Sequence, residues 1–458
     1  MKISEFILEV KSGNIDKEDY INKVIDEAKK INKEYNYFNT IIEKPVINKG
    51  KLNGLPVSVK DCICVKDIES TAGSKILKGY APLFNATAVQ NSIDNGAVII
   101  GKTSQDEFGF GGFNINVGID FKIPLNPFDT ERVTGGSSGG AAGYTQKTKF
   151  AHFAIAESTG GSIVNPASFC GVVGLCPTYG LVSRYGLIDY ANSLDKIGIM
   201  AKNVEDAVTA LNIIKGYDKK DSTSIKDTID LTKFLNKDVK GLKIGVIKES
   251  LKVDKPVNKA VWNAIKDLEK LGIKYKEISL PLTYKYGIAC YYLLAMTEAS
   301  TNLAKYCGMR YGLHEELKGN FNEYFSQVRS LGFGKEVKRR IILGTFARMA
   351  GFRDAYYLKA AKVRTLITQE YRGLFKKFDI LLSPTMPVIA PKFLDTLKLT
   401  PLQNYMMDIL TVGPNLAGLP HMTIPCGQEK GMPIGLMLIA DHLKESKLIQ
   451  VAGAYERK

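Results

Sequence analysis

The spacing of hydrophobic residues predicts two amphipathic helices at the start of the chain. Apolar side chains recur at the i, i+3, i+4, i+7 spacing between Ile3 and Val10, and Gly13 follows as a stop. The same period continues between Ile21 and Ile31. We expect these N-terminal helices, within residues 1–37, to carry no chemistry and to pack on a core or on a partner subunit.

Further along, short apolar runs alternate with helical stretches. Strand patterns lie at 55–61, 97–100, 242–247, 273–280, 379–383, 422–425 and 434–439, and helical patterns lie at 86–95 and 256–271. A strand, a helix and a strand at this spacing favour parallel βαβ units with helices on the sheet faces. The polar stretch 218–236 is predicted to be a surface excursion, and the stretch 284–378 is predicted to be helical and basic.

Composition indicates a water-soluble globular protein. Of the 458 residues, 45% are hydrophobic and 24% are charged, which is ordinary for such proteins. No apolar run approaches the roughly 18 residues of a membrane span, and the N-terminus lacks a secretory apolar region. The 7 cysteines form no CxxC pair. We therefore expect reduced thiols and a cytoplasmic location.

The net charge of +15 admits two interpretations. Between Arg310 and Lys377 there are 15 Lys and Arg but only 6 Asp and Glu. Such a basic stretch favours an anionic partner such as RNA. It is equally typical of a solvated, lysine-rich helical surface, and charge alone does not decide between them.

Two catalytic motifs match in their letters but not in their context. Residues 96–103 (GAVIIGKT) fit the phosphate-loop pattern, yet their interior reads as a strand and not as a flexible turn. Residues 136–140 fit GxSxG, but a loop and not a buried strand precedes them. The four histidines, which show neither partners nor metal-ligand spacing, are His152, His314, His421 and His442. We predict no ATP site, no Ser-His-Asp triad and no metal site.

Two glycine-framed serine clusters form the candidate site. They are GGSSGG at 135–140 and TGGS at 159–162. Paired glycines indicate turns with positive φ or a close approach to another group. A lysine can activate a serine if burial in apolar surroundings keeps its amine neutral, and Lys60 ends an apolar strand pattern.

These features resemble the amidase signature family. The resembling blocks cover nearly the whole chain and run in order through GLPVSVKD (54–61), GAVIIGKT (96–103), GGSSGG (135–140), TGGSI (159–163), PASFCGVVGLCPTYGLVSRYGL (166–187), LAGLPHMTIPCG and GMPIGLMLIA. The resemblance implies an α/β fold with one large mixed sheet covered by helices on both faces. We predict a single domain over 1–458, with a helical and βαβ insertion at 205–378.

The resemblance also implies a Ser–Ser–Lys triad. Carried over by motif, Ser162 is the nucleophile, Ser137 relays the proton after a cis peptide bond, and Lys60 is the base. The backbone N–H groups of Thr159, Gly160 and Gly161 are expected to face the oxyanion. Ser138 is expected either to hold the relay by hydrogen bonds or to be a plain turn serine.

Within the family the chain is most similar to the glutamine-hydrolysing members that work in tRNA-dependent amidotransferases. The resembling text includes TAGSKIL (71–77), GKTSQDEFGFG (101–111), EVKRRIILGTFA (336–347) and YMMDILTVGPNLAGLP (405–420). This resemblance places Arg340 on the α-carboxylate of glutamine and Asp408 on its α-amine. A zwitterion needs one fixed charge of each sign, and a guanidinium suits a carboxylate. Arg340 could instead be a solvated or RNA-facing charge in its basic run.

The chain departs from the family pattern beside the nucleophile. The common block reads SDTGGSIR, whereas residues 157–164 read ESTGGSIV, so Ser158 replaces the usual aspartate and Val164 the usual arginine. One extra residue separates the two serine clusters, which we place in the loop 144–152. These changes leave the hydrogen bonding around the nucleophile open.

The predicted function is glutamine hydrolysis within a complex for protein biosynthesis. The resemblance implies that ammonia passes to a B-type kinase and transamidase subunit, with a small C-type subunit, to amidate Glu-tRNA(Gln) or Asp-tRNA(Asn). ATP and Mg²⁺ are expected on that partner, and no cofactor is expected in this chain. The alternatives are a free-standing amidase for a small amide and a non-catalytic scaffold that binds tRNA or partners.

Overall fold

A computed structural model describes residues 1–458 and contains one sheet of 11 strands. The strands are β1 (Phe38–Ile41), β2 (Pro56–Lys60), β3 (Val98–Thr103), β4 (Phe153–Ser158), β5 (Val173–Cys176), β6 (Lys196–Ala201), β7 (Lys243–Ile247), β8 (Lys274–Ile278), β9 (Ile380–Pro384), β10 (His421–Glu429) and β11 (Met432–Ile439). Their order in the sheet is β1-β3-β2-β4-β6-β5-β10-β11-β9-β7-β8.

The sheet is mixed. Strand β2 runs parallel to β3 and β4, and β7 runs parallel to β8 and β9, while the other neighbours are antiparallel. The predicted βαβ units are thus confirmed towards both ends of the sheet. The predicted mixed sheet is also confirmed, since β4, β5, β6 and β10 pair antiparallel at its centre.

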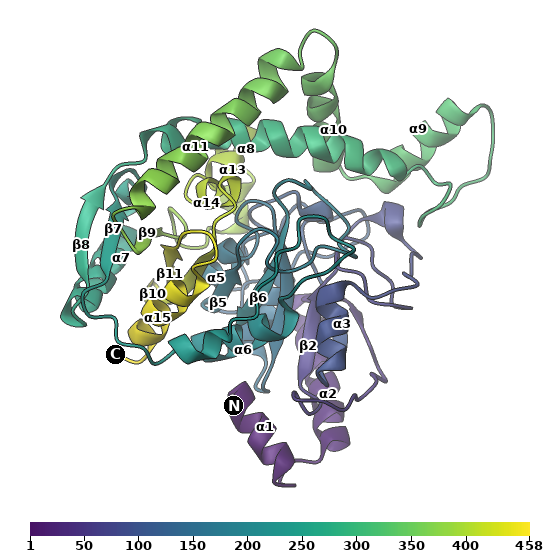
Figure 1. Cartoon of the computed structure of the whole chain (residues 1–458). Coiled ribbons are helices and arrows are strands. Elements are labelled where there is room, and N and C mark those ends of the chain that lie inside the picture. The colour runs from purple at the N-terminus through teal and green to yellow at the C-terminus, as the bar shows by residue number, and fades with distance from the viewer.

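Helices cover both faces of the sheet. They are α1 (Ile3–Lys11), α2 (Lys17–Tyr35), α3 (Thr87–Asp94), α4 (Gly139–Lys147), α5 (Val164–Cys170), α6 (Val204–Ile214), α7 (Lys255–Lys270), α8 (Pro281–Asn302), α9 (Phe321–Gly332), α10 (Lys335–Arg348), α11 (Lys359–Phe375), α12 (Phe393–Thr396), α13 (Pro401–Met406), α14 (Val412–Leu416) and α15 (Glu445–Glu456). Helices α6 and α15 lie in front of the sheet in Figure 1, and α5 lies behind it. Helix α8 packs against α10 and α11 in a separate helical layer, seen at the top of Figure 1.

Local sequence accounts for the helix ends. The side chain of Asp16 accepts the N–H of Asp19 at the start of α2, and Asn36 ends that helix in the left-handed conformation with φ 59°. Pro256 lies in the first turn of α7, where its missing N–H costs no hydrogen bond. Helix α1 packs on α6, and the backbone N–H of Ile3 donates to Asp206. The predicted N-terminal helices therefore lie against the core of the same chain.

Strands β2, β3 and β4 are buried along their whole length because helices cover both faces. The letters of the phosphate-loop pattern fall on β3, which includes Gly101, Lys102 and Thr103. An extended strand cannot wrap its N–H groups around a phosphate, so the predicted absence of a phosphate loop there agrees with the backbone. One hydrophobic cluster runs from α1 to α15. Every helix is too short or too polar to serve as a membrane span.

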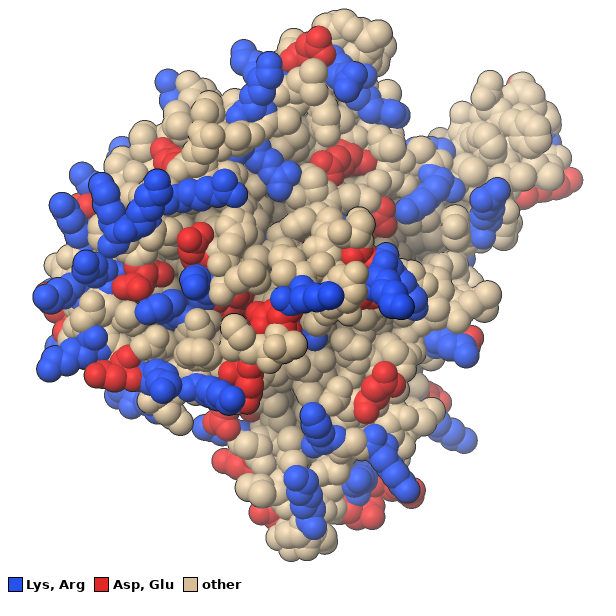
Figure 2. All heavy atoms as spheres, viewed as in Figure 1, with Lys and Arg blue, Asp and Glu red and all other residues tan.

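On the face seen in Figure 2, basic side chains are dispersed. Lys and Arg are spread across the surface and interspersed with Asp and Glu, and they are densest at the left edge, over β7, β8 and α7. Such mixing is typical of a solvated surface. On this face, the view favours the second interpretation of the positive charge.

Candidate active site

Lys60 and Ser137 are in direct contact. Lys60 is the last residue of β2, its side chain is fully buried, and its Nζ donates to Ser137 Oγ at 2.7 Å. Ser137 lies just before α4, and a cis peptide bond joins it to Gly136. A side chain at 136 would collide with Asp106, which explains the glycine there. The structure thus brings the predicted base and the predicted relay together.

The second glycine cluster connects β4 to α5 and contains Ser162. The Ser162 hydroxyl makes no hydrogen bond within the protein, including none to Ser137, and the residue is 6% exposed. A Cβ at Gly160 would lie 2.8 Å from the hydroxyl of Tyr291, and one at Gly161 would collide with Asn165. Close approach, and not positive φ, therefore requires these two glycines.

The backbone around Ser162 presents unused donors. The N–H groups of Thr159, Gly160, Gly161 and Ser162 donate no hydrogen bond within the protein, although these residues are buried. Buried N–H groups without a partner are rare in native structures. A cluster of them beside a serine hydroxyl is the arrangement that stabilises a developing oxyanion.

Lys60 does not lie in the apolar surroundings that we expected. The carboxylate of Glu157, at the end of β4, lies 2.8 Å from Lys60 Nζ, and both side chains are buried. Lys60 also donates to the backbone carbonyl of Glu157 at 3.1 Å. Sequence reasoning missed this acid, and the available signal was one acidic residue at the end of the buried run Phe-Ala-Ile-Ala.

The residues that depart from the family pattern are buried beside this pair. Ser138 Oγ donates to the carbonyl of Glu157 at 3.2 Å, and so ties the relay segment to β4. The Ser158 hydroxyl has no hydrogen-bond partner. Val164 is buried at the start of α5. Ser158 and Val164 therefore form no polar pair in place of the usual aspartate and arginine.

Arg340 is buried among aromatic rings. Its residue is 2% exposed, so the interpretation as a solvated or RNA-facing charge is wrong. The guanidinium carbon lies 5.0 to 5.7 Å from the ring centroids of Phe110, Tyr190, Tyr292 and Tyr405. Arg340 donates to the Tyr190 hydroxyl at 2.6 Å and to Glu336 at 2.9 Å. Aromatic faces stabilise a buried cation.

Asp408 also contacts Tyr292, through the hydroxyl group of that ring. The Tyr292 hydroxyl donates to Asp408 at 2.7 Å, and Asn165, three residues after Ser162, donates to its other oxygen at 3.0 Å. Burial raises the pKa of the Asp408 carboxyl. One side chain thus has its ring against the guanidinium of Arg340 and its hydroxyl on the carboxyl of Asp408.

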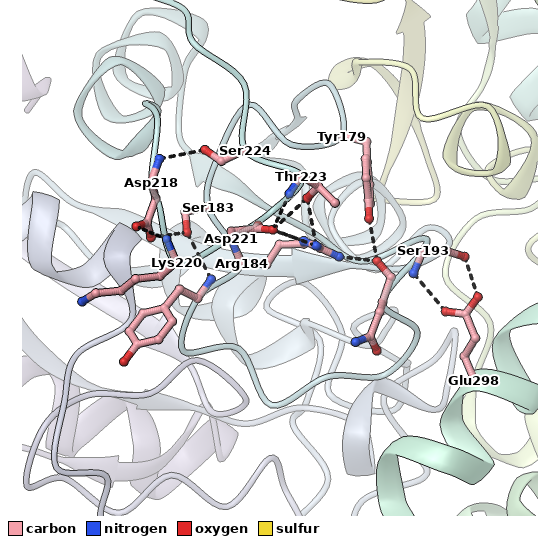
Figure 3. Close-up of polar contacts among 12 residues, drawn as sticks. Tyr179, Ser183, Arg184, Ser193, Asp218, Lys220, Asp221, Thr223, Ser224 and Glu298 are labelled. Atoms are coloured by element: carbon pink, nitrogen blue, oxygen red, sulfur yellow. Dashed lines mark hydrogen bonds and ion pairs between the residues drawn. The ribbon is translucent and has the colours of Figure 1, made fainter.

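Tyr190 reaches Arg340 from a loop that is held by polar contacts. Arg184 pairs with Asp221 at 2.9 Å, Tyr179 donates to the carbonyl of Asn192 at 2.7 Å, and Ser193 donates to Glu298 at 2.6 Å (Figure 3). A polar pocket of about 230 Å³ opens beside this loop, and its lining includes Arg184, Asn192 and Asp195. These contacts fix the loop that carries Tyr190 and Asp195.

The histidines take no part in this site. His152 contacts Ser58 at 3.0 Å, and burial lowers the pKa of His152 to about 3, so its ring stays neutral. His421 contacts the carbonyl of Leu419. No group of three or more His, Cys, Asp and Glu side chains is arranged around a possible metal position.

Comparison with known proteins gives concordant results. A family model described as Amidase matches residues 18–449. The A subunit of glutamyl-tRNA(Gln) amidotransferase from Methanosarcina mazei is 46% identical over 438 residues, which is 95% of this chain and 88% of that protein. The protein of the same name from Trichormus variabilis is 48% identical over 415 residues, covering 89% of this chain and 84% of that one.

Solved structures show the same fold. The A subunit of glutamyl-tRNA(Gln) amidotransferase from Thermotoga maritima matches with a TM-score of 0.83 and 35% identity, covering 100% of this chain and 94% of that chain. A 6-aminohexanoate cyclic dimer hydrolase matches with a TM-score of 0.87 at 20% identity, covering 100% and 96% of the two chains. At 20% identity, the similarity to the 6-aminohexanoate cyclic dimer hydrolase shows a shared fold and nothing more.

Proposed function

This chain belongs to the amidase family, and from that premise we propose that it hydrolyses glutamine as the A subunit of a tRNA-dependent amidotransferase. The observation that carries the choice of glutamine is that Arg340 and Asp408 are both buried and both contact Tyr292. A buried cation and a buried carboxyl group joined by one tyrosine suit the α-carboxylate and α-amine of a free amino acid. A simple amide substrate requires neither group.

The mechanism builds on the contact between Lys60 and Ser137 and on the position of Ser162 in the second glycine cluster. Ser162 attacks the side-chain amide carbon of glutamine while its proton moves through Ser137 towards Lys60, which contacts Ser137. The free N–H groups of Thr159, Gly160 and Gly161 stabilise the oxyanion, at about 3–4 kcal/mol for each donor. The proton returns to the leaving nitrogen, ammonia departs, and water releases glutamate from Ser162.

The ammonia serves a second protein of the complex. The relatives from Methanosarcina mazei and Trichormus variabilis carry the name of one component of glutamyl-tRNA(Gln) amidotransferase, so the chain functions within a multi-subunit amidotransferase. We assign the ATP and Mg²⁺ chemistry to a B-type partner, together with a small C-type subunit. The acceptor is Glu-tRNA(Gln), Asp-tRNA(Asn) or both.

Co-purification from the source cell tests this assignment. The chain, tagged and isolated with its partners, is assayed for glutamate and ammonia release with and without aminoacyl-tRNA. We expect glutaminase activity that increases when a misacylated tRNA and ATP are present. Full-rate hydrolysis by the isolated chain, indifferent to tRNA and partners, would favour a free-standing amidase instead. No glutaminase activity in the complete complex would favour a scaffold.

Arg340→Met tests the placement of glutamine. Loss of a charge-assisted hydrogen bond of about 1.5–3 kcal/mol predicts a KM for glutamine that is roughly 10- to 150-fold higher, with a smaller change in kcat. Arg339→Met is the matched control, because Arg339 also pairs with Glu336 but its side chain is 34% exposed. We expect the control KM within about twofold of the wild type. A glutamine titration of Arg340→Met with unchanged KM would remove Arg340 from the site.

A further inference from the structure

The Lys60 side chain has all three of its ammonium protons engaged. Its Nζ donates to Ser137 Oγ at 2.7 Å, to Glu157 Oε2 at 2.8 Å and to the Glu157 carbonyl at 3.1 Å. An ammonium group carries three donors and no lone pair. In this arrangement Lys60 cannot accept a proton from Ser137 until it has given one away.

The hydroxyl of Thr159 lies between two buried carboxyl groups, those of Glu157 and Asp195. Thr159 Oγ1 lies 2.7 Å from Glu157 Oε1 and 2.8 Å from Asp195 Oδ1. One hydroxyl supplies one proton, so one of the two contacts needs a proton from a carboxylic acid. Burial and the charge of Glu157 raise the pKa of Asp195 well above its usual range. Glu157, Thr159 and Asp195 thus form one hydrogen-bonded group beside Lys60.

We infer that the carboxylate of Glu157 takes up the proton that Lys60 releases, so that the Lys60–Glu157 pair, and not Lys60 alone, is the general base. This inference rests on the proposed hydrolysis of an amide by Ser162. Glu157 touches no substrate atom and acts only through Lys60. In the common family block a serine occupies its position, so this arrangement distinguishes the chain from the common pattern.

The protons balance over one cycle. As Ser162 attacks, its proton moves to Ser137, the Ser137 proton moves to Lys60, and an N–H bond of Lys60 breaks while an O–H bond forms on Glu157. The pair then holds one extra positive charge opposite the negative oxyanion. When the carbon–nitrogen bond breaks, the same proton returns through Lys60 and Ser137 to the leaving nitrogen. Water repeats the sequence on the acyl-enzyme, and no other reactant is required.

The surroundings of Glu157 favour this exchange. Lys60 and Cys62 face it from β2 and the residues just after it, Cys176 from β5, and Asp195 from the loop before β6. Burial raises the pKa of both thiols, so the cysteines remain neutral. Asp195 also lines the polar pocket of about 230 Å³ beside the Tyr190 loop. A hydrogen-bonded chain thus runs from Ser137 to a hollow open to water.

The test is the pH dependence of Glu157→Gln in the assembled complex. If the Lys60–Glu157 pair is the general base, removing the carboxylate changes the group whose protonation sets the acid limb of kcat/KM. We expect the acid limb to move upward by about one pH unit or more, so that the variant loses about tenfold more activity near pH 6 than near pH 8.5. KM for glutamine should change little, because Glu157 is outside the Arg340 and Asp408 contacts.

Two further variants complete the test. Glu445→Gln is the matched control, since Glu445 is equally buried but contacts Thr178, and its profile should coincide with that of the wild type. Glu157→Asp keeps a carboxylate and should give an intermediate acid limb, which covers the case in which Glu157→Gln fails to fold. Superimposable profiles for Glu157→Gln and wild type, or an acid limb of Glu157→Asp that does not move, would overturn the inference.

The labelling of Ser162 by phenylmethanesulfonyl fluoride separates this inference from the proposed function. The rate of labelling depends on the general base but not on glutamine. An upward shift of the labelling profile in Glu157→Gln, without glutaminase activity in the wild-type complex, would keep the role of Glu157 and refute glutamine as the substrate. Glutaminase activity in the wild-type complex, together with an unshifted labelling profile in Glu157→Gln, would keep glutamine as the substrate and refute the role of Glu157.

Discussion

Ser162→Ala is expected to abolish ammonia release from glutamine while the complex still amidates tRNA with added ammonium. The variant removes the only group placed to form the acyl-enzyme, and loss of a serine nucleophile typically lowers kcat by about 10⁴- to 10⁶-fold. The binding contacts of Arg340 and Asp408 remain, so glutamine should still bind. Partner proteins that use free ammonia do not depend on the missing hydroxyl.

Both activities are measured on the same purified complex, one as glutamate release and the other as amidated tRNA with ammonium chloride. Ser158→Ala serves as the control, because its buried hydroxyl lies in the adjacent strand end and has no hydrogen-bond partner. Removing such a group costs little stability. Loss of both activities in Ser162→Ala would contradict the role of Ser162. Loss of ammonia release in the control would show that the departure at position 158 matters to the chemistry.

The outer parts of the fold were predictable from hydrophobic period alone. The bounds predicted for the strand, helix and strand at 242–280 agree with those of β7, α7 and β8 within about two residues, since each element has a regular hydrophobic period. The strands at the centre of the sheet were not predictable in this way. Strands β4, β5 and β6 are buried on both faces, so they show no alternation, and β4 even ends in an acid and a serine.

The residues of the site also differ in whether a local sequence pattern predicts them. Lys60 and the two serine clusters carry local signals, because a strand end and paired glycines are visible in a few residues. The ring cluster around Arg340 comes from four distant segments, at Phe110, Tyr190, Tyr292 and Tyr405. No local pattern links them, and charge counting alone leaves Arg340 in a solvated basic run. Only the packing of α8 and α10 over the sheet buries this arginine.

Glu157 is the residue that most changes the chemistry expected from sequence. A lysine buried among apolar groups loses its proton to escape the cost of a buried charge. Here the carboxylate of Glu157 lies 2.8 Å from Lys60 Nζ, so the two residues are buried together as an ion pair. A lysine in apolar surroundings and a lysine paired with a carboxylate both occur at the end of a buried strand, so the local sequence around Lys60 does not distinguish them.

Lys60→Met therefore has two expected effects that can be separated. It should abolish ammonia release, because Ser137 loses its proton acceptor. It should also lower the free energy of unfolding by about 3–5 kcal/mol, because the Glu157 carboxylate is left buried without its cation. Thermal or denaturant unfolding of the purified chain, alongside the glutaminase assay of the complex, measures both.

The double variant Lys60→Met with Glu157→Gln decides between a structural and a chemical role for the lysine. Replacing both partners removes the buried charge, so most of the lost stability should return while activity stays absent. Lys102→Met is a matched control, since Lys102 is also fully buried but lies 3.6 Å from Asp61 and contacts neither serine. We expect that control to lose stability and yet to release ammonia in proportion to its folded fraction. If the double variant regained activity together with stability, Lys60 would serve only to neutralise Glu157, and the proton path from Ser162 would have to end elsewhere.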